Sequence, residues 1–235
     1  MTVLFWDIDG TLLTTAKAGV FAWDDAVREI TGREFQLASI RIAGLTDYQI
    51  AVRTFESLGL DAGDDLVERL VRRYESLLPS SLPRRTGRVL PNVREILEAF
   101  HPRADVRSYL LTGNTRGGAR AKLTHYGLWE FFPSGAFAED TRDRSTIAER
   151  ALSLAREGGP LEPDQAFVIG DTPHDIHCAN AIGVRTIAVA TGGYSVDELA
   201  PHQPWRVFEE LPGPDEFRRL IGVADAAGAG APGPA

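Results

Sequence analysis

Two carboxylates stand two residues apart at the end of the first apolar run of the chain. The run begins at Val3, and the segment that ends it, residues 7–11, reads Asp-Ile-Asp-Gly-Thr. Such a run is typical of a buried strand, and buried charge is costly unless it meets a cation or hydrogen-bond donors. Asp7 and Asp9 therefore predict chemistry at the end of a strand, most simply around a catalytic metal ion.

A second polar cluster, Thr112, Gly113 and Asn114, follows an apolar run and precedes a helix that opens near Arg116. The Thr112 hydroxyl is a donor, Gly113 lets the backbone approach a ligand closely, and N–H groups at a helix start favour negative charge. These features suit an anion. The alternative is an ordinary turn with a helix N-cap, the commoner role for such a segment taken alone.

Asp171 and Asp175 follow a third apolar run, which ends at Gly170. If a helix begins near Pro173, its first turn can place both carboxylates toward one pocket, and hard cations prefer oxygen ligands. Alternatively, Asp171 is an N-cap and Asp175 interacts with the helix dipole. The first pair of carboxylates weakens this alternative, because four acids at the ends of two strands would repel one another without a cation.

The elements that must position these residues follow an α/β pattern. Short apolar runs alternate with amphipathic stretches, which is typical of a parallel sheet covered by helices. We predict a helix at 145–156 and strands at 3–6, 106–111, 166–169, 184–189 and 206–208. Open parallel sheets bind their ligands at the carboxyl ends of the strands, where all three polar clusters lie.

Residues 14–86 show helical periodicity only. We predict helices at 20–30, 47–58 and 64–77, with Pro79, Pro83 and Gly87 as breakers after the last. The segment leaves the first strand at its carboxyl end, so it can cover the site. The predicted domains are an α/β core at 1–13 and 87–223, an inserted all-helical cap at 14–86, and a disordered Ala-, Gly- and Pro-rich tail at 224–235.

Composition narrows the partners of the protein. The 235 residues are 43% apolar, carry a formal charge of −8 and have a pI near 5.2. This apolar content suffices for a full core, and the lack of basic clusters argues against nucleic-acid binding. The single cysteine, Cys178, excludes an intramolecular disulfide, and no apolar stretch resembles a signal peptide or a membrane span. We expect a cytoplasmic monomer or homodimer without a membrane partner.

The three clusters, in this order, resemble the motifs of the haloacid dehalogenase-like (HAD) hydrolase superfamily, most of whose members are phosphatases, and within it the phosphoglycolate phosphatase-like group. The resemblance covers the whole core and leaves residues 14–86 in the position of the helical cap of that family. It implies a Rossmann-like core with helices on both faces, Mg²⁺ as cofactor and a small phosphorylated metabolite as substrate. The phosphoryl-binding motif is matched by Thr112 and the backbone around Gly113 and Asn114.

The resemblance also implies a role for each acid. Asp7 matches the nucleophile, which forms an aspartyl-phosphate, and Asp9 matches the general acid/base, which protonates the leaving alcohol and then activates water. The Mg²⁺ ligands are matched by the Asp7 carboxylate, the Asp9 backbone carbonyl and Asp171. Asp175 matches either a further ligand or a residue that holds a coordinated water.

One element departs from the family pattern. The family usually supplies a lysine after the second motif to neutralise the phosphoryl group, but residues 138–146 contain none. Arg144 is the best substitute by position, since a guanidinium offers a permanent charge and fixed donors. Lys122 is the rival, with a solvated helix face as its alternative role. Arg142 and Lys17 are favoured as surface residues.

These features predict a Mg²⁺-dependent phosphatase that hydrolyses a small phosphomonoester. Sugar-phosphate mutases with a similar cap tend to carry a histidine shortly after the first motif, where this chain has Gly19, so hydrolysis is favoured. The alternatives are a phosphotransferase or mutase of the same superfamily and a catalytically silent regulatory protein that binds a phosphoryl ligand. Elsewhere we expect Trp6 in the core and His174 at the surface. Thr46 or Asp47 is expected as a helix cap, and the alternative role of their segment, 44–47, is to face the substrate.

Overall fold

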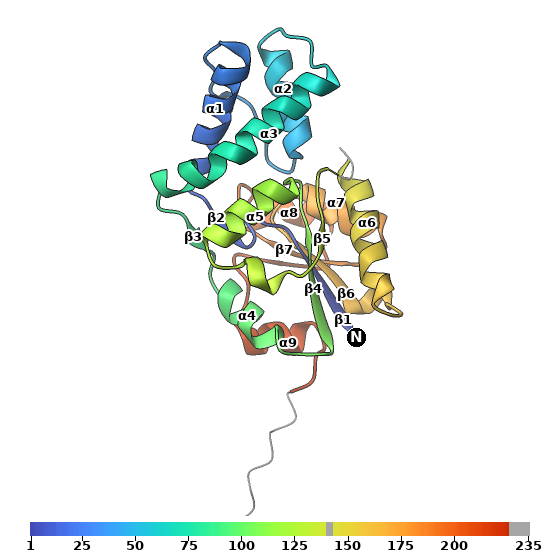
Figure 1. Cartoon of the computed structure of the whole chain (residues 1–235). Coiled ribbons are helices and arrows are strands. Elements are labelled where there is room, and N and C mark those ends of the chain that lie inside the picture. The colour runs from blue at the N-terminus through green and yellow to red at the C-terminus, as the bar shows by residue number, and fades with distance from the viewer. Residues whose placement is uncertain (140–142, 226–235) are drawn as a thin grey trace, which may run out of the picture.

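A six-stranded sheet forms the centre of the protein, whose computed structural model describes residues 1–139 and 143–225 (Figure 1). Neighbouring strands run parallel in the order β5-β4-β1-β6-β7-β8. The strands are β1 (Thr2–Trp6), β4 (Val106–Leu111), β5 (Gly135–Ala136), β6 (Ala166–Gly170), β7 (Arg185–Val189) and β8 (Arg206–Phe208). The predicted fold class is confirmed, and so are the five predicted strands, while the short β5 was not predicted.

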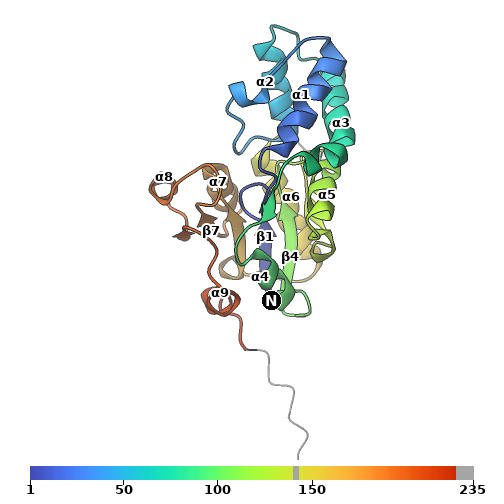
Figure 2. The same ribbon diagram turned by 90° about the vertical axis from the view of Figure 1, so that its left-hand side faces the viewer.

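Helices cover both faces of this sheet and form a separate group above it (Figures 1 and 2). The α-helices are α1 (Ala18–Thr31), α2 (Asp47–Ser57), α3 (Asp64–Ser81), α4 (Val93–Phe100), α5 (Arg116–His125), α6 (Arg144–Glu157), α7 (Pro173–Ala181), α8 (Val196–Leu199) and α9 (Pro214–Leu220). None of those in the described part of the chain is long and apolar enough to cross a membrane. Of the tail predicted to be disordered, residues 226–235 lie outside the described residues.

The alternation of side chains along β1 builds a core on each face. Leu4 and Trp6 point to the face packed by α4, α5 and α9, whereas Val3 and Phe5 point to the face packed by α6 and α7. The Trp6 ring stacks on Phe217 with centroids 6.0 Å apart and is fully buried. Trp6 is therefore a core residue, as expected.

The register of the central strands brings their carboxyl ends to one edge. Trp6 at the end of β1 pairs with Leu110 of β4 and with Ile169 of β6. The residues that follow these three strands are the three polar clusters of the sequence. The sheet therefore places them side by side, although more than 100 residues separate the first cluster from the second.

Helices α1, α2 and α3 lie above this edge and share a hydrophobic core of their own (Figures 1 and 2). Its largest residue, Trp23, is buried, donates a hydrogen bond to Thr54 (3.1 Å) and meets the Tyr74 ring edge-on at 4.9 Å. The chain enters and leaves this group through a small two-stranded antiparallel sheet, β2 (Leu13–Thr14) with β3 (Arg88–Val89). The cap boundaries at 14 and 86 stay a prediction.

The three predicted helices of this segment are present, but the predicted end of the third is wrong. Helix α3 continues through Pro79 to Ser81. A proline removes one intrahelical hydrogen bond, yet the residues around it are held by tertiary contacts. Leu78 is fully buried, and the Ser81 hydroxyl donates to the Ala18 carbonyl of α1 (2.6 Å).

Candidate active site

Three buried carboxylates meet where β1 and β6 end. Asp7, Asp171 and Asp175 each offer an oxygen within 4.8 Å of the others. Burial, followed by repulsion from Asp175, raises the pKa of Asp7 to about 7, although Arg144 opposes this. Burial and then the charges of Asp175 and Asp7 raise the pKa of Asp171 well above its ordinary value. The cluster therefore favours an added positive charge.

The surroundings of Asp171 fit an oxygen-coordinated cation. Its Oδ1 accepts a hydrogen bond from the Thr11 hydroxyl (3.2 Å), while two glycines leave the carboxylate room. A Cβ on Gly10 would lie 2.4 Å from Oδ2 of Asp171, and one on Gly192 only 1.7 Å from it. This cradle and the purely carboxylate donor set suit a hard divalent ion such as Mg²⁺.

Asp175 has a different environment from the other two acids. Its Oδ1 accepts from Nη2 of Arg144, and its Oδ2 accepts from the backbone N–H (3.0 Å) and hydroxyl (2.7 Å) of Thr172. Thr172, not Asp171, is the N-cap of α7, so the alternative in which Asp171 caps this helix is wrong. Asp171 is left free for another role, whereas both oxygens of Asp175 are occupied.

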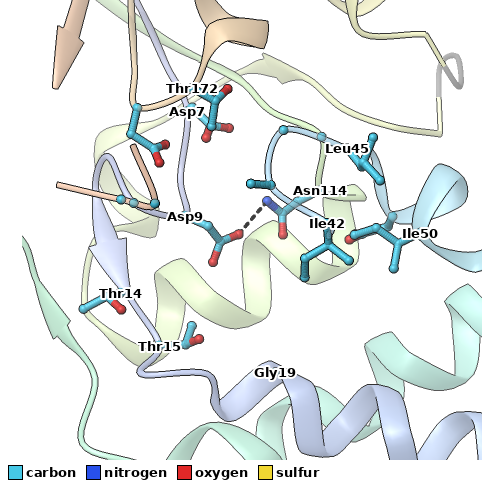
Figure 3. A pocket seen from close by; sticks show the side chains of 18 of the residues that line it. Asp7, Asp9, Thr14, Thr15, Gly19, Ile42, Leu45, Ile50, Asn114 and Thr172 are labelled. Atoms are coloured by element: carbon cyan, nitrogen blue, oxygen red, sulfur yellow. Dashed lines mark hydrogen bonds between the residues drawn. The ribbon is translucent and has the colours of Figure 1, made fainter. Parts of the chain in front are cut away.

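Asp9 turns away from this trio toward a second group of polar side chains. Its Oδ2 accepts from Nδ2 of Asn114 (3.0 Å), as Figure 3 shows. The same oxygen accepts from Nζ of Lys122 (2.5 Å), and Lys122 also donates to Oδ1 of Asn114 (2.6 Å). The Asp9 side chain is 43% exposed, so it keeps access to the cavity beside it. Asp9 is thus positioned by two donors from the next strand and helix.

Lys122 is buried, with 7% of its side chain exposed, which makes the alternative of a solvated helix face wrong. Burial alone would lower the pKa of Lys122. The negative charge of Asp9, with Tyr74 and Asp47 nearby, outweighs burial and holds this pKa above its ordinary value. Lys122 therefore remains protonated in the site.

Arg144 is the first residue of α6 and is buried on the other side of the site. Its Nη2 lies 3.7 Å from Oδ1 of Asp7 and donates to Asp175. Among the described residues, its Nε has no hydrogen-bond partner, so the guanidinium keeps a spare donor. Arg144 thus places a positive charge beside Asp7, as Lys122 does beside Asp9. Lys17 is exposed and also lines the cavity, while Arg142 lies outside the described residues.

In the second cluster, residues 112–114, all three residues are buried and two of them line the cavity. Thr112 is fully buried, its side chain acts to lower the pKa of Asp7, and its hydroxyl accepts from Nδ2 of Asn114 (2.9 Å). Gly113 and Asn114 line the cavity. The N-cap of α5 is Thr115, whose hydroxyl accepts from the N–H of Gly118 (3.1 Å). A turn with a helix N-cap, the alternative role, is therefore present, with Thr115 as the cap, while Gly113 and Asn114 also line the cavity.

Asp47 belongs to the site through contacts with the core that neither of its expected roles, helix cap or part of a segment facing the substrate, includes. Thr46 is the N-cap of α2, while Asp47 is buried and reaches the core. Its Oδ2 accepts from the Thr115 N–H (2.8 Å), and its own N–H donates to the Gly113 carbonyl (2.9 Å). Burial raises the pKa of Asp47 to about 6, although Lys122 opposes it. These contacts join α2 to the start of α5.

A cavity of about 460 Å³ lies between these residues and helices α1 and α2. Asp7, Asp9, Arg144 and Lys122 line its core side. His174, expected at the surface, is instead half-buried against Gly44. A Cβ added to Gly44 would lie 2.1 Å from Cδ2 of the His174 imidazole. The loop that bears Gly44 therefore packs directly onto the first turn of α7.

Comparisons with known proteins agree on one family. A family model described as haloacid dehalogenase-like hydrolase matches residues 3–189. "Probable phosphatase IndB" of Dickeya dadantii is 26% identical over 95% of this chain and 94% of its own. The phosphoglycolate phosphatase of Rhodospirillum rubrum is 27% identical over 88% of this chain and 87% of its own. A solved structure titled as a predicted phosphoglycolate phosphatase from Haemophilus somnus covers 94% of this chain and 98% of its own, with a TM-score of 0.72 and 17% identity, and shares the fold.

Proposed function

The chain belongs to the haloacid dehalogenase-like hydrolase family and to its phosphoglycolate phosphatase-like group, and from this premise we propose a Mg²⁺-dependent phosphatase that hydrolyses a small phosphomonoester through an aspartyl-phosphate. The observation that supports the proposal best is the pairing of two differently placed acids. Asp7 lies in a buried carboxylate cluster, while Asp9, two residues later, faces the cavity between two donors. One acid is suited to attack and the other to move protons.

In this mechanism a carboxylate oxygen of Asp7 attacks phosphorus, and the bond between phosphorus and the ester oxygen breaks. Asp9 donates its proton to the departing alcohol oxygen. It then accepts a proton from the water that attacks the aspartyl-phosphate, so inorganic phosphate leaves and both acids return to their first state. Asn114 and Lys122 hold the Asp9 side chain in place during both half-reactions.

Mg²⁺, when bound by Asp7, Asp171 and the Asp9 carbonyl, would reduce the repulsion between the nucleophile and the incoming anion. Asp175, whose two oxygens already accept hydrogen bonds, holds the Arg144 guanidinium in position. The Arg144 guanidinium then balances charge beside Asp7, while the backbone at Gly113 lines the same cavity as an anion donor.

Several further attributes remain proposals. The substrate is a small phosphorylated metabolite, and no nucleic-acid or membrane partner is proposed. A cytoplasmic location and a monomeric or homodimeric state are expected. Helices α1–α3 act as a cap over the site.

Phosphate release from a panel of phosphoglycolate, nucleoside monophosphates and sugar phosphates, with and without Mg²⁺, tests the proposal. Asp7→Asn should lower the rate about a thousandfold or more, since the nucleophile is lost. Asp24→Asn, in α1 and outside the cavity, is the matched control and should stay active. Equal activity of wild type and Asp7→Asn would refute the mechanism.

The same assay separates the alternatives. Binding of Mg²⁺ and inorganic phosphate without release from any substrate would favour a silent phosphoryl-ligand binder. Transfer to an added sugar in excess of release to water would favour a phosphotransferase or mutase.

A further inference from the structure

Most of the side chains that the helical segment contributes to the cavity are apolar, beside Lys17, Asp47 and Tyr74. The apolar wall consists of side chains from α1, α2 and the connection between them, namely Val20, Trp23, Leu37, Ile42, Leu45 and Ile50. Figure 3 shows Ile42, Leu45 and Ile50 together on one side of the pocket, with Thr14 and Thr15 on another. Trp23 and Ile50 belong to the core of α1–α3, so packing fixes the position of this wall.

The charged groups near this wall offer little to an acidic leaving group. Lys122 is already bonded to Asp9 and Asn114, and Lys17 is exposed to solvent. The Asp47 carboxylate also lines the cavity and would repel a second anion. A carboxylate pointing toward the wall would therefore lose its hydration and would meet, among the described lining residues that are not already bonded to an acid, only Lys17, whose charge is screened by solvent, so its burial is costly.

The orientation of a substrate follows from the chemistry of the two sides. Its phosphoryl group must lie beside Asp7, so its organic part must extend toward the apolar wall. A cavity of about 460 Å³ falls in the usual size range of small-molecule sites and has room for a phosphoryl group and a ring.

Resting on the proposed phosphatase function, we infer that the preferred substrate is a phosphomonoester whose alcohol part is uncharged and apolar, about one ring in size. A phosphorylated acid such as phosphoglycolate is disfavoured. Specificity is set by Ile42 and its apolar neighbours, which contact the leaving group.

Three esters of primary alcohols test this inference: benzyl phosphate, 4-carboxybenzyl phosphate and phosphoglycolate. The two benzyl esters differ only in a carboxylate, so their comparison isolates its effect. Benzyl phosphate should have a kcat/KM at least about tenfold above either acid, the usual scale of discrimination by an apolar pocket. An equal or higher kcat/KM for the acids overturns the inference alone. Absence of release from all three esters and from the panel above overturns the proposed function instead.

Variants at position 42 test the wall itself. Ile42→Lys should raise the ratio of kcat/KM for 4-carboxybenzyl over benzyl phosphate about tenfold or more, a gain that general damage cannot produce. Ile40→Lys is the matched control, because Ile40 is also half-buried in the same connection but does not line the cavity. If the lysine variants do not fold, the KM for benzyl phosphate is compared between Ile42→Ser and Ile40→Ser. It should rise in Ile42→Ser only. Equal ratios, or equal KM values in the serine pair, overturn the assignment.

Discussion

Gly192→Ala should weaken Mg²⁺ binding without unfolding the protein. The added Cβ would lie 1.7 Å from Oδ2 of Asp171, whereas real Cβ atoms essentially never approach a heavy atom within 3.0 Å. The carboxylate must therefore move by at least 3.0 − 1.7 = 1.3 Å. Oδ2 is the end of a flexible side chain, so this movement costs little folding energy.

The same movement is large for a metal ligand. Metal–ligand distances hold to within about 0.2 Å, so a shift of this size removes Asp171 from the coordination sphere. Changes to the partners that merely support a ligand cost about 10–100-fold in metal affinity. We expect the Kd for Mg²⁺ to rise by about 100-fold, equivalent to ~3 kcal/mol.

The neighbouring glycine provides the control. A Cβ on Gly193 would meet nothing within 4 Å, so Gly193→Ala should bind Mg²⁺ like the wild type. Calorimetric titration with Mg²⁺ measures both Kd values, and thermal melting without metal verifies that each variant is folded. If folded Gly192→Ala binds Mg²⁺ as tightly as Gly193→Ala, Asp171 is not a ligand and the proposed coordination is wrong.

Two further predictions concern the charged groups around the cavity. Arg144→Met should weaken competitive inhibition by inorganic phosphate about 10–100-fold, the value of a hydrogen bond to a charged group, and by more than Lys122→Met, because Lys122 is bonded to Asp9 and Asn114. Inhibition constants in the reverse order would assign the phosphate-binding cation to Lys122. Asp47→Asn should flatten the pH dependence of the free energy of unfolding. The pKa of Asp47 is raised from 3.8 to about 6 in the folded protein, so ionisation of this carboxyl opposes folding. In the wild type, ~3 kcal/mol of unfolding free energy is therefore lost as the pH rises from about 4 to about 6. Urea denaturation of both proteins at pH 4 and 7 measures this difference, and identical pH dependence would refute it.

The strands that bear the motifs were predictable because their signals are local. The strands β1 and β6 are apolar runs followed by polar residues, and β4 ends in Tyr-Leu-Leu directly before its polar cluster, so the predicted 106–111 coincides with β4. The pairing of β2 with β3 was not predictable, since it joins Leu13 to Val89, which the whole helical segment separates in the sequence. Helix α3 continues past Pro79 because Ser81 donates a hydrogen bond to the Ala18 carbonyl, a tertiary contact that the local sequence pattern cannot predict.

The site contacts that sequence reasoning missed share one physical cause. Asp47 at the start of a helix has the pattern of a favourable dipole partner, and its bond to the Thr115 N–H exists only after α2 packs on α5. Gly192 stands in an ordinary Thr-Gly-Gly turn, and its contact with Asp171 depends on the loop after β7. Such roles arise from tertiary contacts alone.

The sequence presents Arg144 and Lys122 as rivals for one position, but the structure gives each acid of the first motif its own cation. Arg144 lies beside Asp7 and Asp175, and Lys122 is bonded to Asp9. The four acids of the two motifs carry four negative charges when ionised, and the two cations cancel two of them. One divalent ion would balance the remaining two before a phosphate dianion arrives, and Arg144 carries the same single charge as the lysine that the family usually supplies at this position. The departure from the family pattern therefore preserves the demand for a divalent metal, with the basic charge divided between two helices.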